Sequence, residues 1–228
     1  MGVAARRQRE KEERKTAILE AAEKVFVAKG VGTATMDDIA HEAELSKGTL
    51  YLYFDSKDEL YLEIAVRAVR DIVAAFEAAE AGAGSGYDHV ERMVDAYLKF
   101  ATEHSDRFLV AIGWMTTEPG PVASSERFGE YRRLVGEAHG MATRAIELGK
   151  RDGSVRDDVE TSTLVAQMWG ATLGVLTLQL NAAQVSRRIP GNVHLEDIVF
   201  SFAELLLRAI RPADSVLVGR SDHRSEVA

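Results

Sequence analysis

The sequence predicts an all-α protein, and three observations support this fold class. Apolar residues recur at every third or fourth position along nearly the whole chain of 228 residues, which is the period of an amphipathic helix. Alternating runs rich in β-branched residues, which would indicate strands, are absent. Stretches that contain Gly and Pro separate the periodic segments from one another. Together these patterns predict about nine helices.

The composition limits the kind of protein. With 46% hydrophobic residues the chain can bury a full core, and without cysteine it has no disulfide and no thiolate metal site. The chain starts with charged residues and a helix, without the apolar stretch of a signal peptide, so we expect a cytoplasmic location. The net charge of −8 argues against indiscriminate binding of nucleic acid. Residues 1–60 carry ten Lys and Arg against twelve Asp and Glu, and within them only the first 15 are basic, with six Lys and Arg against three Glu.

The first four helices have clear boundary signals. A first helix spans residues 16–29, and two short helices and a longer one follow it. Gly30 is the stop signal of the first helix. The next three helices have N-caps, which are Thr35 paired with Asp38, then Ser46, then Ser56 paired with Glu59.

The remaining helices are separated by loops. The glycine-rich stretch at 81–88 is a connecting loop rather than a nucleotide-binding loop, because no strand precedes it. Further helices are predicted at 88–104, 105–117, 124–151, 159–181 and 194–211, before Pro212 and a mobile tail at 213–228. No G-x-S-x-G or H-E-x-x-H motif occurs, and the histidines lack ligand spacing. We therefore predict no catalytic residue, no metal site and no cofactor.

Residues 36–54 have the pattern of a helix-turn-helix, with two short helices joined by the link ELS. Leu45, Leu50 and Phe54 would close the core against the preceding helices. The opposite side of the third helix would then present small, basic and tyrosine side chains. A glycine allows close approach to a base or phosphate, a tyrosine hydroxyl donates to phosphate oxygens, and a lysine reaches either. Half-buried packing is the alternative interpretation of the two tyrosines.

Four motifs in this region carry a resemblance to a known family. They are F-x-x-x-G at the end of the first helix, T-x-x-D-I-A in the second, S-K-G-T-L-Y-x-Y-F in the third and S-K-x-E-L at the start of the fourth. With them, the segment from Thr16 to Ala65 resembles the DNA-binding domain of the tetracycline-repressor (TetR) family. One departure is Glu44, where relatives usually have glycine, so this residue must adopt a left-handed conformation or the turn must differ.

The resemblance implies specific contacts with DNA. The Thr35 hydroxyl would meet a phosphate, and Lys47, Gly48 and Thr49 would face bases. Tyr51, Tyr53 and Lys57 would hold the DNA backbone. The expected DNA-binding residues are Thr35, Ser46, Lys47, Gly48, Thr49, Tyr51, Leu52, Tyr53 and Lys57. Two interpretations of the N-terminal arm, RRQREKEERKTA at residues 6–17, stay open. It is a solvated helix with i,i+4 ion pairs, or Arg6, Arg7 or Arg9 contacts the minor groove or a phosphate.

The uncharged segment 161–180 is long enough to cross a membrane. It holds seven Ser, Thr or Gln residues and lies among amphipathic helices, so we favour a buried helix in a soluble homodimer over a membrane span. The family resemblance implies the same dimer, built from the last two long helices. The expected interface residues are Gly170, Gly174, Leu178, Leu195, Ile198, Phe202 and Leu205.

Bulky, mildly polar residues are frequent in the middle of the chain, where the family resemblance implies a small-molecule pocket. Ordinary core packing is the alternative for each of them. The candidate lining residues are Phe108, Trp114, Met115, Tyr131, His139, Met141, Gln167, Met168 and Trp169. No charged residue marks an ionic ligand among them, which favours an apolar or aromatic effector.

These observations combine into one expected organisation. Residues 1–62 form a helix-turn-helix DNA-binding domain with its arm, and 63–212 form a ligand-binding and dimerisation domain. The expected function is a dimeric transcriptional regulator, a repressor that leaves a palindromic operator when it binds a small molecule. The alternatives are a helical-bundle carrier or enzyme, or a DNA-organising protein of the same fold without an inducer.

Overall fold

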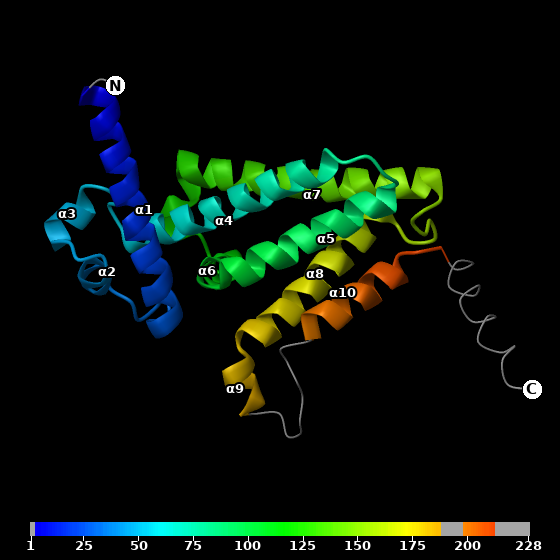
Figure 1. The fold of residues 1–228 in the computed structure, drawn as a ribbon. Helices are drawn as coiled ribbons and strands as arrows, with labels where there is room; N and C mark the ends of the chain where they lie inside the picture. The colour runs from blue at the N-terminus through cyan, green and yellow to red at the C-terminus, as the bar shows by residue number, and fades with distance from the viewer. Residues whose placement is uncertain (1–2, 188–197, 213–228) are drawn as a thin grey trace, which may run out of the picture. The chain divides into compact units, whose positions relative to one another are not determined.

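The structure, a computed structural model, describes residues 3–187 and 198–212. Over these residues it contains ten α-helices, one 3-10 helix and no strand (Figure 1), so the predicted all-α fold class is confirmed. The elements are α1 (Val3–Lys29), α2 (Met36–Glu42), α3 (Lys47–Tyr51), α4 (Lys57–Glu80), α5 (Gly86–Glu103), α6 (Ser105–Met115), η1 (Gly120–Ser124), α7 (Glu126–Asp152), α8 (Thr161–Leu180), α9 (Ala182–Ser186) and α10 (Ile198–Ala209).

Two helices differ from the prediction. The short α9 was not predicted, and α1 begins at Val3 instead of residue 16. The early start agrees with the i,i+4 interpretation of the arm. Arg6 Nε donates to Glu10 at 2.8 Å and Gln8 Nε2 donates to Glu12 at 2.9 Å. The start predicted for the last helix at 194, and the tail at 213–228, lie outside the described residues.

The chain forms two compact units. One comprises Met1–Asp71 with His104–Val135, and the other comprises Ile72–Glu103 with Gly136–Ala228. Helices α4 and α7 each contribute residues to both units. The boundary at residue 62 separates the expected DNA-binding domain from the expected ligand-binding domain, and it stays a prediction. The boundaries of the compact units are different, because α6 packs against α1 and belongs to the first unit.

The core of the first unit surrounds α1. Ile18 and Phe26 of α1 are buried together with Ile39 of α2, Leu50 of α3 and Phe54 in the link that follows α3. The helix-turn-helix pattern placed Leu45, Leu50 and Phe54 inside. Leu45 is only partly covered, whereas Leu50 and Phe54 are buried as predicted. Their burial orients α2 and α3 and leaves the opposite side of α3 uncovered.

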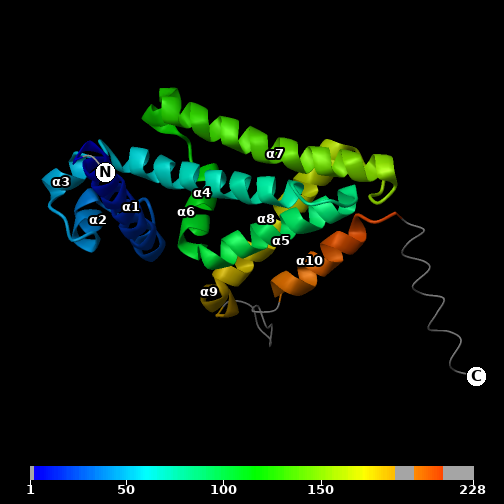
Figure 2. The ribbon, with the colours of Figure 1, turned by 45° about the horizontal axis from the view of Figure 1, so that its top comes forward.

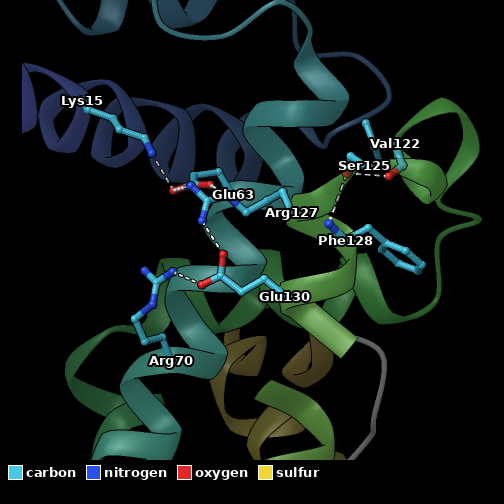
Figure 3. A network of polar contacts seen from close by, with 8 residues as sticks. All are labelled: Lys15, Glu63, Arg70, Val122, Ser125, Arg127, Phe128 and Glu130. Carbon is cyan, nitrogen blue, oxygen red and sulfur yellow. Dashed lines mark hydrogen bonds and ion pairs between the residues drawn. The ribbon is translucent and has the colours of Figure 1, made fainter. Parts of the chain in front are cut away.

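A chain of ion pairs crosses the same unit from α1 through α4 to α7 (Figure 3). The buried carboxylate of Glu63 lies 2.8 Å from Lys15 Nζ and 2.6 Å from Arg127 Nε. Glu130 then pairs with Arg127 and with Arg70, each at 2.5 Å. The Arg70 guanidinium, followed by Arg127, lowers the pKa of the Glu130 carboxyl. The network holds three helices in one arrangement.

In the second unit, α10 packs on α8, and the two helices lie side by side in both views (Figures 1 and 2). The side of α10 that faces its own chain buries Val199, Ala203 and Leu207. Phe200 and Leu205 point away and are 75% and 65% exposed. Helix α8 is long and apolar enough to cross a membrane by length and composition alone, yet only 28% of its most apolar stretch is buried. The unit therefore carries an open apolar surface on these two helices.

Candidate DNA-binding site

Side-chain caps shape the two short helices of the helix-turn-helix. The Thr35 Oγ1 accepts from the Asp38 N–H at 3.1 Å, and the Asp38 carboxylate accepts from the Thr35 N–H at 3.0 Å, which is a complete capping box. The Ser46 Oγ accepts from the Thr49 N–H at 3.1 Å and caps α3. Bonds from Lys29 first and Thr35 second lower the pKa of Asp38 to about 2. The capping functions predicted for Thr35 and Ser46 are present.

The start signal predicted for α4, Ser56 with Glu59, is only partly reciprocal. The Ser56 Oγ accepts from the Glu59 N–H at 3.1 Å, as in a capping box. The Glu59 carboxylate, however, accepts from the N–H of Asp55 at 2.8 Å. In a full capping box the Glu59 carboxylate would accept from the Ser56 N–H, one residue later. The bond to Asp55 instead connects the α3–α4 link to the first turn of α4.

The turn between α2 and α3 depends on Glu44. Its φ is +54°, which makes it the one non-glycine residue with positive φ in the part of the chain that the structure describes. The Glu44 N–H donates to the His41 carbonyl at 3.1 Å, and the Leu45 N–H donates to the Ala40 carbonyl at 2.8 Å. These bonds close α2 and reverse the chain. Of the two possibilities that the sequence left open, a left-handed Glu44 or a different turn, the structure has the left-handed residue. A non-glycine residue in this conformation is strained.

The outward side of α3 is open to solvent. Leu52 is 80% exposed and Tyr51 is 42% exposed. Among the described residues outside its own helix backbone, a Cβ built on Gly48 would have only the Ser46 Oγ, at 3.9 Å, within 4 Å. Helix α3 ends at Tyr51, so Leu52 is its C-cap and the half-buried Tyr53 belongs to the link that follows. A large apolar side chain and an uncovered backbone thus lie together on one protruding surface.

The two lysines of this surface have partners that the sequence did not predict. Lys47 Nζ lies 2.9 Å from the Asp37 carboxylate, and that carboxylate raises the pKa of Lys47. Lys57 Nζ donates to the carbonyls of Val31 at 2.6 Å, Gly32 at 3.4 Å and Ala34 at 2.9 Å. The ammonium of Lys57 therefore closes the α1–α2 turn.

The candidate effector residues lie in both units. Trp114 stands in a chain of edge-to-face aromatic contacts in the first unit, 5.1 Å from Tyr61 and 6.3 Å from Tyr131 between ring centroids. Burial raises the pKa of both tyrosines. Phe108 is buried in the same unit, and Met115 is exposed.

The other five candidates belong to the second unit. Met141 and Met168 are buried there, whereas His139, Gln167 and Trp169 are exposed. Trp169 hydrogen-bonds Tyr97, whose pKa burial raises to about 12. All nine residues stay candidates.

The interface candidates differ in how far their own chain covers them. Apart from its own helix backbone, no described part of the chain lies within 4 Å of a Cβ built on Gly170 or on Gly174. Leu178 is exposed like Leu205, and Ile198 and Phe202 are partly covered. Leu195 lies outside the described residues. Within residues 3–187 and 198–212, no group of three or more His, Asp or Glu residues is placed to hold a metal ion.

A helix-turn-helix with capped helices, a reversed turn and a protruding third helix defines a DNA-binding regulator. Sequence comparison then gives the family. A profile of the bacterial regulatory proteins of the tetR family matches residues 18–64. The uncharacterized HTH-type transcriptional regulator YhgD of Bacillus subtilis is 31% identical over 144 residues, which are 63% of this chain and 73% of YhgD. The chain belongs to the tetR family and is a transcriptional regulator, so the resemblance seen in the sequence is confirmed.

Two further proteins are similar over most of their length. The HTH-type transcriptional repressor KstR2 of Rhodococcus jostii is 27% identical over 180 residues, which are 75% of this chain and 86% of KstR2. The transcriptional regulator FadR of Bacillus subtilis, solved in complex with stearoyl-CoA, has a TM-score of 0.67. The match covers 86% of this chain and 99% of FadR at 15% identity, and so shows a shared fold.

Proposed function

We propose that the protein is a dimeric repressor that binds a palindromic operator and leaves it when a small molecule binds. The observation that carries the proposal is the uncovered surface of α3, where Gly48, Tyr51 and Leu52 protrude from a capped frame. In a helix-turn-helix protein such a surface enters the major groove. The similarity to the repressor KstR2 over 75% of this chain supports repression.

The proposed contacts divide by chemistry. Gly48 and Thr49 would bring the backbone close to base edges, and Leu52 would cover a thymine methyl or a sugar. Thr35, Ser46, Tyr51 and Tyr53 carry hydroxyls suited to phosphate oxygens, and these add no charge. Lys47 would leave its ion pair with Asp37 and contact a base or a phosphate of the DNA instead. A phosphate contact from Lys57 would replace one of its three carbonyl bonds.

The proposed dimer uses the open apolar surface of α8 and α10. Gly170 and Gly174 leave room for a partner helix, and Leu178, Phe202 and Leu205 supply apolar area around them. A second copy covers this surface in the way a helix bundle requires. The Ser, Thr and Gln side chains along α8 favour a protein partner over lipid.

The proposed effector is apolar or aromatic. The aromatic contacts around Trp114 supply a suitable lining, and the similarly folded FadR binds stearoyl-CoA. A ligand changes DNA affinity only if it binds one conformation of the protein more tightly than another. Reversing a 1:99 population needs a preference of about 5.5 kcal/mol, which two apolar ligands on a dimer could supply together.

The decisive experiment is a gel-shift assay with the DNA upstream of the protein's own gene, followed by footprinting. We expect a shifted complex and a protected palindrome with half-sites about 34–36 Å apart, or a multiple of that distance. Absence of any shift at low salt with adjacent fragments would favour the carrier or enzyme alternative. A shift that no small molecule reverses would favour the DNA-organising alternative.

The effector is tested with stearoyl-CoA as the first probe. An effector should quench tryptophan fluorescence, raise the melting temperature and bind more weakly when operator DNA is present, because coupling between sites is reciprocal. Equal affinity for free and DNA-bound protein would show that the bound compound has no regulatory role.

A further inference from the structure

The helix-turn-helix has an unfavourable charge for binding DNA. From Gly30 to Leu60 it carries two lysines against seven acidic residues, a net charge of −5. Lys47 is paired with Asp37, and Lys57 is held by three carbonyls. Non-specific attraction to DNA comes from cations that displace counterions from phosphates. Because both lysines already have partners, they can supply only part of this attraction, so further cations must lie outside this segment.

The N-terminal part of α1 carries them on one side. Arg7, Lys11 and Arg14 are spaced by four and three residues, so they share one helix face. At about 100° per residue they span an arc of roughly 60° that contains no acidic residue. Glu10, at the edge of this arc, is paired with Arg6. We call Arg7, Lys11 and Arg14 the cationic face of the arm.

The cationic face is exposed and unpaired. All three side chains are solvent-exposed, and none of them forms an ion pair with any residue that the structure describes. Like charges at this spacing destabilise an isolated helix by a few tenths of a kcal/mol (about 0.2–0.5). Contact with a polyanion would remove that repulsion. Figure 1 shows this part of α1 projecting beyond α2 and α3.

The base of the arm shows the direction in which the cationic face points. Lys15 follows Lys11 by four residues and lies on the same side of α1. Its ammonium is 5.8 Å from the centroid of the Phe54 ring and 2.8 Å from Glu63 on α4. Phe54 directly follows Tyr53, one of the proposed phosphate contacts. The cationic face therefore rises from the α3–α4 link, along the flank of the proposed DNA surface.

We propose that Arg7, Lys11 and Arg14 form a second, sequence-independent DNA contact, which grips the phosphate backbone beside the groove that α3 enters. The twelve residues Val3–Arg14 extend about 18 Å at 1.5 Å per residue, which exceeds the major-groove width of about 12 Å. The arm is thus long enough to reach the backbone that borders the groove. This inference rests on the proposed function, because it needs α3 to face DNA.

The test compares two double variants of the arm in the gel-shift assay. Lys11→Ala/Arg14→Ala removes two cations from the cationic face. Arg6→Ala/Arg9→Ala removes two cations at the same spacing from the other side of the helix, where both have partners. Both doubles change the net charge equally, and alanine preserves the helix, which circular dichroism verifies.

We expect the first double to lower the slope of log affinity against log salt by about 1.8 per arm, or roughly 3.6 for a dimer with both arms engaged. The control double should leave the slope unchanged. The loss should be equal on the operator fragment and on an unrelated duplex, because phosphates carry no sequence information.

Equal slope changes in both doubles would overturn the inference, because they would indicate a general effect of net charge. Unchanged slopes in both would overturn it as well. Failure of the unmodified protein to bind any upstream fragment would contradict the proposed function itself, which keeps the two failures distinguishable.

Discussion

Arg107 on α6 is bound to Glu23 on α1 inside the first unit, with Nε 2.8 Å from a carboxylate oxygen. The two side chains are only 8% and 9% exposed. A second nitrogen of Arg107 lies 2.7 Å from Asp71 on α4. One guanidinium thus joins the helix that supports the DNA-binding surface to two others.

We predict that Arg107→Met lowers the free energy of unfolding by about 3–5 kcal/mol, because it leaves the Glu23 carboxylate buried without a cation. The double variant Arg107→Met/Glu23→Leu should recover most of this loss, since no buried charge remains. Urea denaturation measures both. A loss below about 1 kcal/mol in the single variant would mean that water reaches Glu23.

Glu44 gives a prediction that separates strain from charge. Glu44→Gly should stabilise the fold by about 0.5–1 kcal/mol, because it removes about 1–2 kcal/mol of left-handed strain and adds flexibility to the unfolded chain. Glu44→Gln removes the charge and keeps the strain, so only its DNA affinity should rise. If both variants show the same stability as the parent, the turn is unstrained.

The pairing of Lys47 with Asp37 predicts that Asp37→Asn raises DNA affinity, because it makes the ammonium available to DNA. Lys47→Ala should lower the salt slope by about one unit per subunit. Glu42→Gln is the matched control, since it changes the charge of the same helix equally and Glu42 is bound to Lys24 at 3.5 Å. Equal gains from Asp37→Asn and Glu42→Gln in gel-shift titrations would show that Lys47 has no particular role.

Gly174 tests the proposed dimer surface. Because no described residue outside the backbone of α8 lies within 4 Å of an added Cβ, Gly174→Leu should leave the fold intact and split the dimer. Gly136→Leu on α7 is the control, since that position is equally uncovered. Sedimentation velocity should find monomers only for the first variant. Dimers in both would place the interface elsewhere.

Asp38 predicts a pH dependence in acid. Its pKa in the folded chain, about 2, is below the usual value of 3.8, so its contribution to stability is present above about pH 4 and is lost as the pH falls towards 2. Asp38→Asn should therefore be less stable than the parent at pH 7 and nearly equal to it at pH 2. Lys29→Met should raise the pKa of Asp38, as measured by NMR titration, because Lys29 lowers it most.

The sequence by itself determined the features that depend on neighbouring residues. Helix periodicity and caps involve residues three or four positions apart, so the all-α fold, the Thr35 and Ser46 caps and the helix-turn-helix could all be predicted. The residues exposed on α3 followed from that frame, because burial of Leu50 and Phe54 fixes its orientation. The sequence indicated that Glu44 either adopts a left-handed conformation or lies in a different turn, but it could not decide between the two.

Only the tertiary structure decided which distant groups meet. Arg107 and Glu23 are 84 residues apart, and Lys57 closes a turn 26 residues before it. No local pattern encodes such pairs, because each depends on how several helices pack at once. The same reason explains α10, whose apolar residues surround most of the helix. Packing against α8 buries Val199, Ala203 and Leu207 and leaves Phe200 and Leu205 exposed.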